Sequence, residues 1–206
     1  LDSPRPVQER PLVLREVKEP EPGPGEIAVR VECCGVCRTD LHVVEGEISL
    51  PVLPIVPGHQ VVGRVAKLGR GAGRFCAGER VGVAWLGRTC GACADCLRGD
   101  ENLCRASVYT GYHRNGGFAE MVVADEAFAY RLPEEGPPAV WAPLLCAGII
   151  GYRALRQAGL GRGETVGLYG FGSSAHIALQ VARHFGNRVF VVTRGEKHRA
   201  LARRMG

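Results

Sequence analysis

The sequence has no long hydrophobic run. Its longest apolar stretch, residues 139–152, is interrupted by Pro143 and is too short to cross a bilayer. The first ten residues, LDSPRPVQER, contain no apolar segment of the kind that a secretory signal peptide requires. Internal repeats and low-complexity tracts are also absent. We therefore expect neither a membrane partner nor a repeat architecture.

The sequence also lacks a strong charge bias. Its 206 residues are 46% hydrophobic and 23% charged, with a formal net charge of +5, as in ordinary globular proteins. A mild basic run at residues 194–204 is typical of a solvated helix face, so nucleic acid is not an expected partner. This length suffices for one large domain or two modest ones. Because the chain starts without Met and stops after a helix-like segment, we expect it to be part of a longer protein.

Cysteine, in contrast, is abundant, and four of the nine cysteines form a C-x₂-C-x₂-C-x₇-C pattern at Cys90, Cys93, Cys96 and Cys104. These short spacings allow one loop to wrap a tetrahedral zinc ion. Because four thiolates leave no open coordination position, such a zinc would be structural. The alternative is two disulfides, although bridges across two-residue gaps are more typical of labile redox pairs. An odd cysteine count with metal-like spacing favours a reducing, cytoplasmic compartment.

The first two thirds of the sequence predict a β-rich domain. Runs of β-branched residues separated by Gly and Pro turns indicate strands, and one short helix lies among them. The expected strands are residues 12–17, 27–33, 61–68, 80–84 and 118–124, and the expected helix is 38–44. Many short strands with this punctuation indicate a partly open barrel or a sandwich.

The pattern changes after Pro137-Pro138, where an apolar, helix-like region runs to about Ala158. A strand at 165–169, a helix at 173–185, a strand at 188–193 and a helix at 196–204 are expected to follow. This order predicts a βαβ unit that contributes to a parallel sheet. We therefore predict an α/β chain with two domains, residues 1–147 and 148–206.

A glycine-rich turn lies between the first strand and helix of that unit. Gly170, Gly172 and Ala175 match G-x-G-x-x-[G/A], in which the glycines permit a tight turn and close approach to a pyrophosphate. Ser173 opens the helix, whose N-terminus presents its positive dipole to phosphate groups. The motif predicts dinucleotide binding, and the alternative is a glycine turn in an unrelated α/β unit.

The end of the second strand bears on the choice of coenzyme. An NAD site has an acidic residue there to bind the ribose 2′-hydroxyl, but this sequence has Thr193 and Arg194. Arg194 could meet a 2′-phosphate, which favours NADP(H) over NAD(H), or it could be an ordinary surface arginine.

Cys37, His59 and Cys146 stand far apart in the sequence, each where the predicted structure turns. Two thiolates and one imidazole form a neutral zinc shell, and an open fourth position could bind and acidify an alcohol oxygen. Isolated cysteines and turn histidines are more often structural. The spacing alone leaves both interpretations open.

Several segments together resemble the zinc-dependent medium-chain alcohol dehydrogenases. The segments CGVCRTDLH, PGHQVVGRV, CGACADCLRGDENLC, LLCAGIIGYRAL and YGFGSSAHIALQVAR follow one another in that family's order. The resemblance implies a GroES-like catalytic domain that holds two zinc ions, followed by the start of a Rossmann domain for NAD or NADP. It implies catalytic zinc on Cys37, His59 and Cys146 and structural zinc on the four-cysteine loop.

The resemblance also implies roles for other residues. Thr39 would take the proton from the alcohol, and His42, three residues on along the same helix face, would form the outer end of the proton relay. Asp40 would orient the imidazole of His59. Arg38 would contact the coenzyme pyrophosphate, and Trp85 would form an aromatic wall that favours small or slender alcohols and aldehydes.

The sequence departs from this family at two positions and in its length. Gln60 replaces a glutamate that often follows the zinc histidine, from which we expect altered ligand exchange without loss of zinc. Ile150 stands where many relatives have threonine near the nicotinamide. Complete relatives are longer, and we expect the full-length protein to form a homodimer or homotetramer.

Three other interpretations remain. A non-catalytic zinc-binding module would hold one zinc ion and bind no nucleotide. A related reductase without catalytic zinc, such as a quinone reductase, would lack the set formed by Cys37, His59 and Cys146. The chain of 206 residues could also be an inactive fragment of the enzyme.

Overall fold

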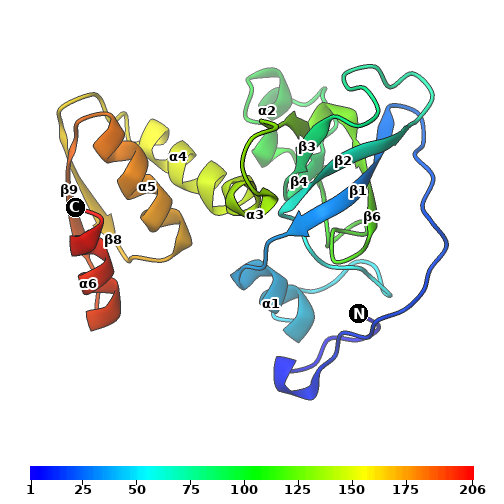
Figure 1. Ribbon diagram of the computed structural model, residues 1–206, viewed down its shortest axis with the longest axis horizontal. Helices are drawn as coiled ribbons and strands as arrows, with labels where there is room; N and C mark the ends of the chain where they lie inside the picture. The colour runs from blue at the N-terminus through cyan, green and yellow to red at the C-terminus, as the bar shows by residue number, and fades with distance from the viewer. The chain divides into compact units, whose positions relative to one another are not determined.

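The computed structural model describes residues 1–206, which divide into two compact units, Leu1–Leu145 and Cys146–Gly206. The first unit is built on a five-stranded antiparallel sheet with the order β6-β1-β2-β3-β7 (Figure 1). Its strands are β1 (Glu26–Cys34), β2 (Val61–Leu68), β3 (Arg80–Val83), β6 (Met121–Asp125) and β7 (Ala129–Arg131).

Apolar β-branched residues on these strands form the main core of the first unit. Alternate strand residues point to the same face, so each strand contributes several apolar side chains to one side of the sheet. Ile27, Val29, Val61, Val81 and Val122 are all less than 2% exposed. The pairing of β1 with β2 shifts register twice, and such bulges bend and twist a sheet. The predicted β-rich, partly open barrel-like architecture is confirmed.

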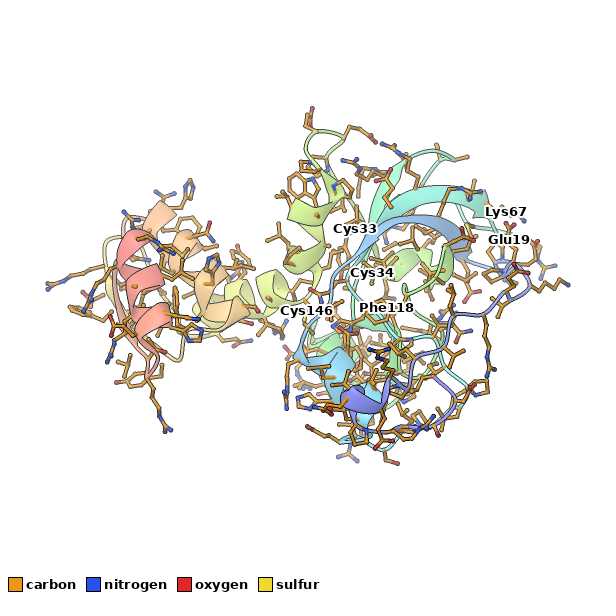
Figure 2. All side chains as sticks on the ribbon, turned by 60° about the horizontal axis from the view of Figure 1, so that its bottom comes forward. Glu19, Cys33, Cys34, Lys67, Phe118 and Cys146 are labelled. Atoms are coloured by element: carbon orange, nitrogen blue, oxygen red, sulfur yellow. The ribbon has the colours of Figure 1, made fainter.

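The strand predicted at residues 12–17 is wrong. Residues 10–23 form no strand or helix, and Leu14 is fully exposed while Val17 is 72% exposed. A run of apolar, partly β-branched residues forms a strand only where a neighbouring strand pairs with its backbone. Here no strand pairs with this segment, and side-chain ion pairs hold its end instead. Lys67 of β2 contacts Glu19 at 3.1 Å and Glu21 at 2.9 Å (Figure 2).

Shorter elements complete the first unit. A two-stranded sheet, β4 (Leu86–Arg88) and β5 (Val108–Tyr109), encloses the cysteine-rich loop with its helix α2 (Ala94–Leu97) and 3₁₀ turn η2 (Glu101–Leu103). The helix predicted at 38–44 is α1 (Arg38–Glu45). The remaining elements are η1 (Val7–Glu9), η3 (Glu126–Phe128), α3 (Pro138–Trp141) and η4 (Ala142–Leu145).

The helical region predicted from Pro137 to Ala158 is interrupted. It comprises α3, η4 and a separate helix α4 (Ala147–Gln157). Pro143 has no N–H to donate within a helix, and the backbone of Cys146, with φ −131° and ψ −79°, is not helical.

The structure contains no single helix with the length and apolar composition of a membrane span. Only the bent pair formed by Pro138–Leu145 and Ala147–Gln157 reaches that length and composition.

The second unit confirms the predicted order of strand, helix, strand and helix. β8 (Thr165–Tyr169) and β9 (Arg188–Val192) pair in parallel, with α5 (Ser173–His184) between them in sequence and α6 (Glu196–Arg204) after them. A parallel pair requires such a crossover connection. The apolar face of α5 is buried in the unit, with Ala178, Leu179 and Ala182 less than 5% exposed.

Gly63 in β2 gives a test of the packing that holds the strand after His59. A Cβ atom at Gly63 would lie 2.2 Å from the carbonyl oxygen of Arg30 on β1, so Gly63→Ala must push the strands apart. We expect a loss of about 1–3 kcal/mol in unfolding free energy, as in other overpacked cores, measured by denaturant titration. Gly73→Ala is the matched control, because a Cβ atom there meets nothing within 4 Å. Equal stability of the two variants would contradict this packing.

Candidate metal centres

The start of helix α1 is organised around Asp40, which is 3% exposed. Cys37 is the N-cap residue, and its Sγ accepts a hydrogen bond from the backbone N–H of Thr39 at 3.4 Å. In return, Asp40 Oδ2 accepts the backbone N–H of Cys37 at 2.8 Å. This is a capping box in which a cysteine takes the position usually held by serine or threonine. The carboxylate therefore fixes the backbone from which the Cys37 thiol projects.

His59 lies in a tight turn held by backbone contacts. Gly58 has φ +97°, and a Cβ atom there would lie 2.6 Å from the Phe118 ring and 3.0 Å from Cys34 Sγ (Figure 2). The backbone N–H of Phe118 donates to the Pro57 carbonyl at 3.0 Å. Only glycine fits such a left-handed and crowded position readily. The turn thus places the His59 side chain, 1% exposed, in a defined position.

The structure brings together the three residues that were scattered in the sequence. The ligand atoms of Cys37, His59 and Cys146 all lie within 4.8 Å of one another, and Cys37 Sγ is 3.4 Å from His59 Nε2. Cys146 is the first residue of the second unit, but it is bonded directly to Leu145, which packs in the core of the first unit. Two sulfurs and one imidazole nitrogen at this spacing suit one zinc ion.

The contact of His59 with Asp40 leaves one ring nitrogen of His59 available to a zinc ion. Asp40 Oδ1 lies 3.1 Å from His59 Nδ1, so an ionised Asp40 places the imidazole proton on Nδ1. Nε2, beside the Cys37 sulfur, then carries the lone pair that a metal requires. Burial alone would lower the pKa of His59, but hydrogen bonds with Asp40 and Cys37 raise this pKa to about 9. A bound cation would instead favour the neutral imidazole.

The other predicted residues of α1 lie on its accessible side. Thr39 and His42 are half-buried and three residues apart, and so lie on one helix face. Arg38 is exposed. Glu47, which sequence analysis did not single out, contacts both Arg38 Nη2, at 3.4 Å, and His42 Nδ1. No sequence pattern marks Glu47, since it lies in an irregular segment after the helix.

The four-cysteine loop forms a second candidate metal centre. The Sγ atoms of Cys90, Cys93, Cys96 and Cys104 all lie within 4.8 Å of one another. None of these four cysteines is in a disulfide, so the disulfide alternative is not observed. Backbone N–H groups of Ala92 and Cys93 lower the pKa of Cys90 to about 6, which favours the thiolate that zinc binds. The hydroxyl of Thr89 likewise lowers the pKa of Cys96. The pKa of Cys93 is instead raised to about 11, because hydrogen bonds with the neighbouring thiols outweigh the effect of the Cys96 backbone N–H.

Aromatic side chains cover one side of His59. Trp85 meets the His59 ring edge-on with centroids 4.9 Å apart, as expected for a wall near the first metal centre. Tyr109 stacks on Trp85 at 5.1 Å, and Tyr112 lies 5.7 Å from it. The two tyrosines were not predicted as part of the site, although their aromatic-rich segment, VYTGYH, lies shortly after the four-cysteine loop.

Gln60 follows His59 and is 3% exposed, but its Nε2 has no hydrogen-bond partner. The side chain packs against Gly35, where a Cβ atom would lie 3.2 Å from it. Leaving a buried amide donor unsatisfied is costly, on the order of 1–3 kcal/mol.

The glycine-rich turn of the second unit is open to a ligand. Gly170 has φ +91°, and Gly172 is the N-cap of α5. Both glycines and Ser173 are exposed, and a Cβ atom at either glycine would meet nothing within 4 Å. Ala175 packs against the apolar cluster of α5, as a small third residue should. Thr193 and the exposed Arg194 follow β9.

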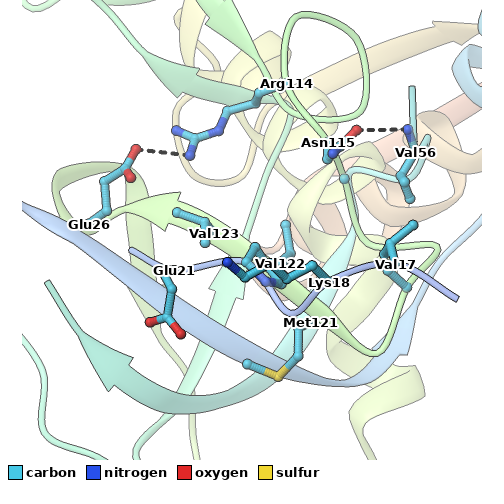
Figure 3. Close-up of a pocket in the computed structure, with 13 residues that line it drawn as sticks. Val17, Lys18, Glu21, Glu26, Val56, Arg114, Asn115, Met121, Val122 and Val123 are labelled. Atoms are coloured by element: carbon cyan, nitrogen blue, oxygen red, sulfur yellow. Dashed lines mark hydrogen bonds and ion pairs between the residues drawn. The ribbon is translucent and has the colours of Figure 1, made fainter. Parts of the chain in front are cut away.

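A separate cavity of about 380 Å³ lies in the first unit between the segment at Val17–Glu21 and strand β6 (Figure 3). Its polar lining is dominated by the ion pair between Glu26 and Arg114, which are 2.9 Å apart. None of the cysteines or histidines of the two candidate metal centres lines it. The metal-ligating groups are therefore not part of this cavity.

Known proteins are similar to this chain in sequence and in structure. Residues 23–134 match the family model described as the alcohol dehydrogenase GroES-like domain. A probable alcohol dehydrogenase AdhA from Mycobacterium tuberculosis is 48% identical over 98% of this chain and 60% of its own length. The chain thus spans less than two thirds of that relative.

Two solved structures are similar across most of the chain. The thermostable alcohol dehydrogenase from Pyrobaculum aerophilum, with cobalt and zinc bound, has a TM-score of 0.88 at 28% identity, covering 100% of this chain and 62% of its own. CAD from Helicobacter pylori, complexed with NADP(H), has a TM-score of 0.82 at 30% identity, covering 89% of this chain and 56% of its own. Because the family model covers more than half of the residues, the chain belongs to the family of alcohol dehydrogenases with a GroES-like domain.

Proposed function

We propose that this chain is the catalytic part of an NAD(P)-dependent zinc alcohol dehydrogenase. The enzyme interconverts a small primary or secondary alcohol and its aldehyde or ketone. The observation that carries the proposal is the convergence of Cys37, His59 and Cys146, with Asp40 holding His59 in the tautomer that a metal requires. The metal-bound relative from Pyrobaculum aerophilum supports it.

We assign two zinc ions to each chain, one to each group of ligands. Zinc held by Cys37, His59 and Cys146 would supply a Lewis acid for the substrate oxygen. Zinc held by Cys90, Cys93, Cys96 and Cys104 would be structural, because four thiolates leave no position for substrate. Asp40 acts by fixing both the Cys37 backbone and the His59 ring.

The proton released by the alcohol passes along helix α1. Thr39 takes it at its hydroxyl, and His42, on the same face, passes it to solvent, to which it is partly exposed. Trp85, with its stacked tyrosines, forms an aromatic wall beside His59 that favours slender substrates. Gln60 stands where relatives often have a glutamate after the zinc histidine, and its neutral amide would alter ligand exchange without preventing zinc binding.

The coenzyme binds at the glycine-rich turn of residues 148–206, which we assign as the start of a Rossmann domain. Gly170, Gly172 and Ser173 leave room for the pyrophosphate at the N-terminus of α5, and Ala175 allows close packing beneath it. Arg38 adds a positive charge for the pyrophosphate. Nicotinamide, when bound, accepts or returns the hydride. Thr193 and Arg194 favour NADP(H), and this preference rests on these two residues, because similar solved structures hold either NADP(H) or NAD.

Residues 1–147 then form the GroES-like catalytic domain, and the full-length enzyme is a cytoplasmic homodimer or homotetramer. A non-catalytic zinc module is disfavoured by the second ligand group, which such a module does not need. The chain spans less than two thirds of the AdhA relative, and the proposed activity is that of the full-length enzyme.

Replacing Cys146 tests the proposal directly. In the full-length protein we expect Cys146→Ser to lower the zinc content from two ions per chain to one. Turnover should fall by about 1000-fold or more, since a Lewis acid contributes several kcal/mol to the transition state. Metal analysis and coupled measurement of alcohol oxidation provide both readouts. Cys76→Ser, an exposed cysteine outside both groups, is the control and should retain both ions. One zinc in the unmodified enzyme would refute the assignment.

Replacing Cys104, the buried member of the four-cysteine loop, should have a different effect. We expect Cys104→Ser to lose the structural zinc and keep the ion bound by His59. Because metal binding at a structural site stabilises the folded state, the melting temperature should fall by about 5–10 °C. Calorimetry and metal analysis measure this. An unchanged zinc content would show that the loop holds no metal.

Arg194 tests the choice of coenzyme. We expect Arg194→Ala to weaken NADPH binding by about 10-fold, because an arginine–phosphate hydrogen bond is lost. The affinity for NADH should stay within about 2-fold of the wild-type value. Fluorescence titration of the full-length enzyme measures both. Arg188→Ala, at the start rather than the end of β9, is the control. If the wild type binds NADH more tightly than NADPH, the proposed preference is incorrect.

A further inference from the structure

We infer that Glu47 is a positioning residue that fixes the proton of His42 and competes with coenzyme phosphate for Arg38. This inference rests on the proposed function, because the roles of His42 and Arg38 belong to it. Its basis is one carboxylate that reaches two side chains of the same helix face. Glu47 Oε2 bonds to His42 Nδ1, and Glu47 Oε1 lies 3.4 Å from Arg38 Nη2.

The contact with His42 determines which ring nitrogen can accept a proton. An ionised carboxylate only accepts hydrogen bonds, so His42 Nδ1 must carry a hydrogen. In the neutral ring, Nε2 is then the basic atom. Glu47 therefore leaves Nε2 of His42 as the ring atom that can take the relayed proton.

The contact of Glu47 with Arg38 opposes the binding of coenzyme. Arg38 and Glu47 are both largely exposed, with 67% and 45% of their side-chain surfaces accessible. A phosphate that approaches Arg38 must share the guanidinium with Glu47 or displace it, and the two anions repel each other. Glu47 consequently weakens coenzyme binding while it supports proton transfer.

Glu45 offers a matched control. It lies two residues before Glu47, has the same charge, and accepts the backbone N–H of Val7 at 3.1 Å. No ion pair or hydrogen bond links Glu45 to His42 or Arg38. The variants Glu47→Ala and Glu45→Ala thus remove the same charge from neighbouring positions, and only the first removes the two contacts.

The experiment uses the full-length protein labelled with ¹⁵N-histidine and free of coenzyme. The signal of His42 is identified as the one that is missing from the spectrum of the His42→Gln variant. Its nitrogen chemical shifts report which ring nitrogen carries the hydrogen. We expect the Nδ1–H form in the wild type and in Glu45→Ala, and a substantial Nε2–H population in Glu47→Ala.

A second measurement compares coenzyme affinity. Glu47→Ala should bind reduced nucleotide about 2- to 5-fold more tightly than the wild type, as for the loss of one exposed charge, whereas Glu45→Ala should bind it as the wild type does.

The kinetic readout separates positioning from general structural damage. In Glu47→Ala we expect kcat for alcohol oxidation to fall by about 10-fold, because the relay histidine is no longer oriented, while coenzyme affinity rises. A misfolded variant would lose both. An unchanged His42 tautomer, or weaker coenzyme binding, in Glu47→Ala would overturn the inference. Wild-type enzyme that neither binds nucleotide nor oxidises alcohols would refute the proposed function, whereas the tautomer measurement would still decide the effect of Glu47.

Discussion

The candidate catalytic site depends on one buried carboxylate. Asp40 accepts the N–H of Cys37 through one oxygen and contacts the His59 ring through the other, so two potential ligands 22 residues apart share one anchor. A buried carboxylate is stable only when its oxygens are hydrogen-bonded, and here both are. The same carboxylate caps α1, which carries Thr39 and His42. Ligand geometry, imidazole tautomer and the orientation of the relay helix are therefore not independent features.

The two candidate metal centres differ in how the chain builds them. The four-cysteine loop takes all of its ligands from 15 consecutive residues, so local sequence alone specifies it. The other centre requires a strand-to-helix junction at Cys37, a turn at His59 and the break before α4 at Cys146. The first can form whenever its loop folds, whereas the second forms only when the sheet of the first unit is in place. This difference suits a stabilising role for one centre and chemistry at the other.

Much of the fold could be predicted from the sequence, because periodicity and turn residues mark elements that are stabilised locally. The strands at 61–68 and 165–169 were predicted with their observed bounds. The strand at 12–17 was wrong because strand formation depends on a partner that the local pattern does not specify. The four-cysteine ligands follow from spacing. The grouping of Cys37 with His59 came from a family resemblance, and Tyr109, Tyr112 and Glu47 escaped notice because only tertiary structure places them.

The cap of α1 has one more consequence. Serine or threonine normally occupies an N-cap position, but here the sulfur of Cys37 both accepts the N–H of Thr39 and faces His59. An oxidant that converted this thiol to a sulfinic acid would therefore release a metal ligand and disturb the first turn of the helix in a single event. Sensitivity to peroxide would then follow from the architecture of the helix start itself, and a tightly held cation would be its natural protection.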